Sequence, residues 1–238
     1  MSKYEGLDRF VSLLFPKGCV LCGKAVDYDN LICQSCVPER PLDIKAICPR
    51  CAKEQESCVC APRESGQWAF EGAVSALLYQ GKTRQAILRL KETPDRRIKS
   101  FFAQEMARTF RELYPDFYFD FITEVPMHPQ RLEKRGFNQA ELLAAEVSPL
   151  LKIPHRMRVL ACTNEIGQQQ HNLTLEERFA AAMNRYILQI RTVADKHILL
   201  IDDVLTTGAT ADACAKQLLS GGAANVFVLT AARTARKN

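Results

Sequence analysis

The hydrophobic positions of residues 67–238 follow two alternating patterns. Short apolar runs bounded by turn residues are typical of buried strands, and they cover residues 73–81, 119–126, 187–190, 197–204 and 225–230. Between them, apolar residues recur every three or four positions, which predicts helices over residues 84–91, 98–114, 137–151 and 211–220. Thr174 and Glu177 have the spacing of a capping box, so a further helix is expected to begin near Leu175. Strands that alternate with helices indicate an α/β domain with a largely parallel sheet.

Residues 1–66 show neither pattern and contain eight of the ten cysteines. The polar segment 61–66, with Pro62 and Gly66, is typical of a linker. We therefore expect two domains, residues 1–66 and residues 67–238. The first has few large apolar side chains and can bury little core, so bound metal would supply most of its folding free energy.

The cysteines of the first domain come in closely spaced pairs. Such spacing lets a tight turn aim both thiolates at one ion, and four thiolates form the tetrahedral cage that Zn2+ prefers. The sequence predicts one or two structural zinc ions with the candidate ligands Cys19, Cys22, Cys33, Cys36, Cys48, Cys51, Cys58 and Cys60. Sequential pairing of the tetrads is simplest, and interleaved pairing stays open. Disulfides would need an oxidising compartment, and an iron–sulfur cluster fits the repeated pairs less well.

The net charge of +5 lies entirely in the second domain. Residues 1–66 hold nine basic and nine acidic side chains, and residues 67–238 hold 23 and 18. Seven basic residues lie between Lys82 and Lys99, which permits phosphate-bearing partners but is also typical of a solvated helix face. Neither a long apolar run nor a cleavable leader is apparent, so we expect a cytoplasmic protein without membrane insertion.

Residues 199–210 combine an apolar strand, two carboxylates, a loop of small hydroxyl residues and the start of a helix. Ligands of open α/β sheets bind beyond the carboxyl ends of the strands. Small residues let backbone amides surround an anion, and the helix adds the positive end of its dipole. Asp202 and Asp203 can accept hydrogen bonds from vicinal hydroxyls such as those of a ribose. The pattern therefore predicts a phosphate site beside a sugar site.

This segment resembles the phosphoribosyl pyrophosphate (PRPP) motif of type I phosphoribosyltransferases. The resemblance implies a parallel sheet with helices on both faces, and it places the ribose hydroxyls on the catalytic pair Asp202 and Asp203. It implies a 5′-phosphate site made by Thr206, Thr207, Gly208, Ala209 and Thr210. In that family a loop after an earlier strand holds pyrophosphate, and here the candidates are Arg131, Lys134 and Arg135. A solvated basic turn is the alternative for these three side chains.

More of the chain is similar to the ComF family of competence proteins, which join a cysteine-rich zinc module to a phosphoribosyltransferase-like domain. The similarity extends over the cysteine pairs, residues 78–81, Lys91, residues 125–129, Arg131, and residues 135–140, 170–178 and 199–210. It implies PRPP binding with Mg2+, which the ligand's oxygens would mainly hold. It also implies a role in natural transformation, with single-stranded DNA and other competence proteins as partners.

Two other functions stay open at this point. The chain is expected to be an active phosphoribosyltransferase of nucleotide metabolism or salvage if an acceptor attacks the ribose, but no segment identifies that acceptor. Such an enzyme would position its reactants and stabilise the departing pyrophosphate. A PRPP-responsive sensor without turnover is the third reading. Aromatic residues make up 8% of the chain and most have apolar neighbours, so the sequence shows no base-stacking platform.

Overall fold

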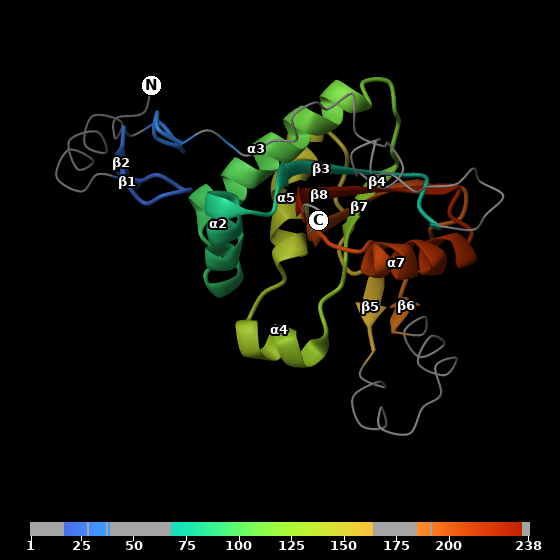
Figure 1. Cartoon of the computed structure of the whole chain (residues 1–238). Helices are drawn as coiled ribbons and strands as arrows, with labels where there is room; N and C mark the ends of the chain where they lie inside the picture. The colour runs from blue at the N-terminus through green and yellow to red at the C-terminus, as the bar shows by residue number, and fades with distance from the viewer. Residues whose placement is uncertain are drawn as a thin grey trace, which may run out of the picture.

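The computed structural model describes residues 17–27, 29–36, 38, 68–163, 185–190 and 192–234 (Figure 1). Four of the candidate metal ligands (Cys48, Cys51, Cys58 and Cys60), the expected linker 61–66 and the expected helix near Leu175 lie outside these residues. The domain boundary at residues 66 and 67 therefore stays a prediction.

Four strands of the described chain form a parallel sheet in the order β3, β8, β7, β4. Their bounds are Gly72–Leu78 for β3, Phe121–Glu124 for β4, His197–Leu205 for β7 and Asn225–Arg233 for β8. Along β7, Leu199 and Ile201 are buried in one core, whereas Ile198 and Leu200 are buried in another. Because both faces are covered, these strands read as continuous apolar runs. The predicted parallel sheet is confirmed.

Helices cover both faces of this sheet. α2 (Gly81–Glu92), α3 (Arg96–Leu113) and α5 (Gln139–Leu151) contribute to the core that contains Leu199. α7 (Ala209–Ser220) packs in the opposite core and lies below the sheet in Figure 1. The helices expected over residues 84–91, 98–114, 137–151 and 211–220 are thus present, each within a few residues of its expected bounds.

Two features were not expected from the pattern. The segment predicted as a strand over residues 187–190 forms β6 (Tyr186–Leu188), which pairs antiparallel with β5 (Leu160–Cys162) outside the main sheet. The short helix α4 (Pro129–Arg135) has no buried residue, so apolar spacing gives no signal for it. Its signals are Pro129 at its first position and Gly136, with φ of 82°, at its end.

Cys19 and Cys22 lie in the turn between two short antiparallel strands, β1 (Lys17–Gly18) and β2 (Ala25–Val26), and Cys33 and Cys36 follow β2. Val20 and Leu21 are 3% and 2% exposed and belong to the same core as α2 and α3. This part of the cysteine-rich module is therefore packed onto the α/β domain. Among the described helices, none has the length and apolar character needed to cross a membrane.

Candidate functional site

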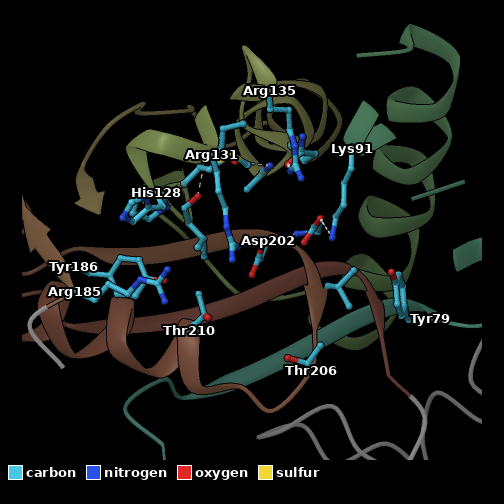
Figure 2. Close-up of a pocket in the computed structure, with 18 residues that line it drawn as sticks. Tyr79, Lys91, His128, Arg131, Arg135, Arg185, Tyr186, Asp202, Thr206 and Thr210 are labelled. Carbon is cyan, nitrogen blue, oxygen red and sulfur yellow. Dashed lines mark hydrogen bonds and ion pairs between the residues drawn. The ribbon is translucent and has the colours of Figure 1, made fainter. Parts of the chain in front are cut away.

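A cavity of about 320 Å³ opens beyond the carboxyl ends of β4 and β7. Its wall combines segments that are far apart in sequence: the end of α2, the connection from β4 through α4 to α5, the start of β6, and the β7–α7 loop (Figure 2). Two acidic side chains line the cavity, Asp202 and Asp203. Its basic side chains are Lys91, Arg131, Arg135 and Arg185, and His128 lines it as well. The cavity therefore suits an anionic ligand that also offers hydroxyl groups.

Asp202 and Asp203 are neighbours in sequence but lie in different environments. Burial raises the pKa of Asp202 well above its usual range and the charge of Asp203 raises it further, while the Asp203 N–H and the charge of Lys91 act in the opposite direction. Asp203 forms an ion pair with Lys91, whose Nζ lies 2.8 Å from Oδ2. Its backbone N–H donates to Asp202 Oδ1 at 2.8 Å. The pair thus favours one ionised carboxylate, balanced by Lys91.

The predicted phosphate residues surround the N-terminus of α7. Thr206 and Thr210 line the cavity, and the Thr207 hydroxyl accepts a hydrogen bond from the Ala209 N–H at 3.3 Å. Gly208 caps the helix with φ of 88°, a left-handed conformation that glycine adopts without strain. The hydroxyls of Thr206 and Thr210 and the positive end of the helix dipole therefore meet at the cavity, which suits a phosphate group. Thr207 and Gly208, by contrast, line a separate small pocket beside Trp68 and Phe70.

Trp68 and Phe70 support this loop from behind. Their rings stack with centroids 5.5 Å apart, and a Cβ atom on Gly208 would lie 3.1 Å from the Trp68 ring. The Ala69 N–H donates to Asp212 Oδ1, in the first turn of α7, at 2.6 Å. The segment that follows the expected linker therefore fixes the position of the loop.

The basic wall comes from α4 and the start of α5. Arg131 and Arg135 line the cavity, and Arg131 points toward Asp202 in Figure 2. Arg135 donates to Gln139 Oε1 at 2.5 Å, while Gln139 Nε2 is buried without a hydrogen-bond partner among the described residues. Lys134, predicted with these arginines, is exposed and does not line the cavity. Asn138 joins the start of α5 to β4, because its Nδ2 donates to the Val125 carbonyl at 2.9 Å.

A second candidate site is the cluster of Cys19, Cys22, Cys33 and Cys36, whose sulfurs all lie within 4.8 Å of one another. A tetrahedron with metal–sulfur bonds of about 2.3 Å has edges of about 3.8 Å, and the sulfurs of Cys22 and Cys33 are 3.6 Å apart. A hydrogen bond with the Ser35 hydroxyl lowers the pKa of Cys33 to about 6. The four thiols therefore fit a structural zinc ion.

Comparisons with known proteins support the cysteine cluster and show the family of the chain. The family described as "Double zinc ribbon domain" matches residues 10–66. The chain is 30% identical to "Competence protein ComFC" of Bacillus subtilis (strain 168) over 216 residues, which cover 87% of this chain and 85% of that one. This chain belongs to the ComFC family. The predicted membership in the ComF competence family is thereby confirmed, and so is the predicted zinc-ribbon module.

Two further matches to this ComFC-family chain cover less of it. "DNA utilization protein YhgH" of Escherichia coli O157:H7 is 35% identical over 115 residues, or 48% of this chain and 50% of that one. Among solved structures, the glutamine PRPP amidotransferase of B. subtilis is 16% identical over 56% of this chain and 26% of that chain, with a TM-score of 0.40.

Sequence reasoning missed Arg185 and Tyr186, which bring β6 to the cavity of this ComFC-family protein. Burial raises the pKa of Tyr186 to about 12, so the phenol stays neutral and can serve as a hydrogen-bond donor. Neither residue belongs to a motif, and β6 approaches α7 only through tertiary packing. Lys91 was part of the family resemblance, but its contact with Asp203 had no signal in the sequence.

Proposed function

We propose that this protein binds PRPP in the cavity between β7 and α4 and acts in the handling of single-stranded DNA during its uptake. The observation that carries the proposal is the convergence of three groups in one cavity. The acidic pair would bind the ribose hydroxyls, Thr206 and Thr210 of the β7–α7 loop would bind the 5′-phosphate, and Arg131 and Arg135, which line the same cavity, would bind the pyrophosphate. Lys134 is the weakest of the proposed pyrophosphate ligands because it is exposed outside the cavity wall.

Charge supports this assignment. Bidentate arginine is well suited to a pyrophosphate, and the unpartnered Gln139 Nε2 adds a buried donor on the same wall. Mg2+ would arrive with PRPP, coordinated mainly by the oxygens of the ligand, and would offset the negative charge of the pyrophosphate. The half-buried acidic pair provides carboxylate oxygens, which can coordinate Mg2+ and accept hydrogen bonds from hydroxyl groups.

PRPP binding is tested by thermal unfolding with and without PRPP and Mg2+. Ligand at 100 times its dissociation constant stabilises a protein by about 2.7 kcal/mol, which for this size raises the Tm by roughly 5–11 °C. Asp203→Asn should abolish the rise because it removes the ribose acceptor and the Lys91 partner. Glu146→Gln is the matched control, since Glu146 pairs with Lys99 away from the cavity. An unchanged Tm in the wild-type protein would contradict PRPP binding.

The DNA role is proposed from the family and from the names of the ComFC and YhgH relatives. Few of the basic residues between Lys82 and Lys99 are available to contact DNA phosphates. Five of the seven basic residues between Lys82 and Lys99 already contact other groups of the chain: Lys82, Arg89, Lys91, Arg97 and Lys99. Arg84 and Arg96 are exposed and have no hydrogen-bond or ion-pair partner among the described residues.

Single-stranded DNA binding is measured by fluorescence anisotropy at several salt concentrations. Phosphate contacts make affinity fall with salt, and changing Arg84 and Arg96 together to Ala should reduce the salt slope by about two counterions. Arg97 is not a suitable target because its loss would disturb the cysteine module. Binding that neither salt nor this double substitution alters would exclude the α2–α3 surface.

Phosphoribosyl transfer is the second candidate, because His128, Arg185 and Tyr186 line the same cavity as the acidic pair and could contact an acceptor. The C1–oxygen bond of PRPP would break, pyrophosphate would leave with the electron pair, and an acceptor nitrogen would attack C1. Release of pyrophosphate that depends on an added purine, pyrimidine or amine would establish transfer. PRPP binding without any such release would favour a PRPP-responsive sensor.

A further inference from the structure

Helix α2 contacts both sites of this protein, the cysteine cluster at its start and the acidic pair at its end. Near its first turn, Lys82 Nζ donates to Cys36 Sγ at 3.4 Å. In its last turn, Lys91 Nζ lies 2.8 Å from Asp203 Oδ2, and Figure 2 shows its side chain extended toward the acidic pair. In Figure 1 the helix lies between the β1–β2 unit and the sheet. One rigid element of 12 residues therefore joins two sites that share no ligand.

The cysteine module is attached to α2 and α3 by polar and apolar contacts. Arg89 donates to the carbonyl of Val20, and Arg97 donates to the carbonyls of Gly18 and Asn30, the latter at 2.6 Å. Gly18 and Val20 flank the ligand Cys19. Cys19, Cys36, Val20 and Leu21 are buried in the same core as Ala86, Ile87 and Leu90 of α2. The conformation of the cysteine loops therefore determines the surface against which α2 packs.

Helix α2 has little stabilisation of its own at its N-terminus. Its cap residue, Gln80, makes no side-chain capping bond, and its first turn has no acidic residue but carries Lys82 and Arg84. Cations at this end oppose the helix dipole. Four thiolates on one divalent ion carry a net negative charge, which would offset the charge of Lys82. A zinc ion bound to the four thiolates would therefore stabilise the start of α2 through Lys82.

At the other end, Lys91 orients one carboxylate of the ribose site. Its ion pair fixes Asp203 Oδ2, and the Asp203 N–H in turn fixes Asp202 Oδ1. Lys91 is also the cation whose charge favours ionisation of the half-buried Asp202. A shift of α2 would therefore change the geometry and the charge of both carboxylates.

We propose that Lys91 is a positioning residue for the acidic pair and that the metal-filled cluster of Cys19, Cys22, Cys33 and Cys36 holds it in place through α2, so that zinc binding and PRPP binding are coupled. The inference rests on the proposed function, since PRPP is the ligand whose binding would be coupled. Coupling of this kind is reciprocal, and it typically changes affinities by roughly 5- to 150-fold. Either ligand should therefore strengthen the binding of the other.

The test follows the transfer of zinc from the full chain to a chromogenic chelator, with and without PRPP and Mg2+. A Cys22→Ser variant should lack the zinc of this cluster. Comparison with it shows which part of the released zinc comes from Cys19, Cys22, Cys33 and Cys36. PRPP is expected to increase the equilibrium affinity of the wild-type protein for this zinc at least fivefold, as measured by its partition between protein and chelator. Calorimetry on the zinc-loaded and zinc-depleted protein should show a weakening of PRPP binding by the same factor.

Variants separate the coupling from simple loss of structure. Lys91→Met should leave zinc content and circular dichroism unchanged, weaken PRPP binding, and remove the effect of PRPP on zinc affinity. Lys99→Met is the matched control, because Lys99 forms an ion pair of similar length, 2.9 Å, on the neighbouring helix. Lys82→Met should lower the coupling without changing any group of the cavity.

The outcomes are distinguishable. PRPP binding that has no effect on zinc affinity would overturn the coupling and leave the proposed function intact. Equal effects of PRPP in the wild-type protein and in Lys91→Met would overturn the positioning role of Lys91. Absence of PRPP binding to the zinc-loaded protein would overturn both the coupling and the proposed function.

Discussion

At the scale of single residues, the site depends on small differences between neighbours. Asp202 and Asp203 are adjacent, yet one is desolvated by burial and the other pairs with Lys91. Gly208 and Gly136 are both left-handed, yet only Gly208 lies against a side chain, that of Trp68. The acidic pair and the pair of glycines each lead to a prediction that substitution can test.

Asp202→Asn should stabilise the unliganded protein at neutral pH while removing PRPP binding. The raised pKa means that the folded state binds the Asp202 proton more tightly than the unfolded state, so this group favours folding at low pH and loses that contribution as pH rises through the folded pKa. The asparagine does not titrate, so the variant does not lose this stability. Its free energy of unfolding should exceed that of the wild-type protein by on the order of 1 kcal/mol, and the difference should grow with pH. Urea unfolding at several pH values measures it; an advantage that shrinks with rising pH would contradict the assignment.

Gly208→Ala should destabilise the protein more than Gly136→Ala. Both substitutions put alanine at positive φ, at a cost of roughly 1–2 kcal/mol. Only the first also places a Cβ 3.1 Å from the Trp68 ring, whereas nothing lies within 4 Å at Gly136. Trp68 is the single tryptophan of the chain, so its emission should change in Gly208→Ala and not in Gly136→Ala. Identical spectra for the two variants would argue against the contact.

At the scale of elements, the site is assembled by the ends of helices. Asn138 caps α5 by accepting from the Ala140 N–H and also donates to the Val125 carbonyl at the end of β4. Asp95 caps α3 by accepting from the N–H groups of Arg97 and Ile98. Both residues cap the start of a helix, but only Asn138 also joins its helix to the strand beside the cavity.

Asn138→Ala should therefore cost more stability than Asp95→Ala. Loss of a cap costs about 1 kcal/mol, and a buried carbonyl left unpaired adds roughly 1–3 kcal/mol. Chemical unfolding should place Asn138→Ala about 2–4 kcal/mol below the wild-type protein and Asp95→Ala about 1 kcal/mol below it. PRPP binding should weaken only in Asn138→Ala, because Arg135 and Gln139 lie next to this cap. Equal losses of stability would mean that the Val125 contact contributes nothing.

At the scale of the whole molecule, the cysteine module and the α/β domain share a core. Val20 and Leu21 are almost fully buried with residues of α2, and three carbonyls of the module accept hydrogen bonds from Arg89 and Arg97. Three of the seven basic residues between Lys82 and Lys99 attach this module: Lys82, Arg89 and Arg97. The two parts should therefore unfold together.

Removal of zinc should lower the Tm of the entire chain, as followed by Trp68 emission. Trp68 packs against the core on the opposite face of the sheet from Val20 and Leu21, so it does not report on the module directly. Loss of the burial of two such side chains, at about 1.5–3 kcal/mol each, should lower the Tm by roughly 6 °C or more. Metal analysis should give about two zinc ions per chain if both cysteine tetrads are filled. An unchanged Trp68 transition after zinc removal would show independent domains.

The local patterns of the sequence were sufficient for much of the fold and for one wall of the site. Apolar periodicity indicated the strands and most helices, since burial on one or two faces leaves a period in the chain. It failed for α4, which buries nothing, and although it indicated β6, it did not identify β5 as the partner of that strand. Cysteine spacing predicted the cluster of Cys19 to Cys36 because its ligands come from two short turns.

The sequence by itself determined the residues that approach one another along the chain: the acidic pair, the threonine loop and the paired cysteines. Only the tertiary structure decided which distant groups complete the site, namely Lys91, Arg185 and the Trp68 support of the loop, and that Lys134 lies outside it. The physical reason is that local motifs depend on backbone geometry over a few residues. A contact such as Lys91 with Asp203, by contrast, depends on how α2 packs between the cysteine module and the sheet.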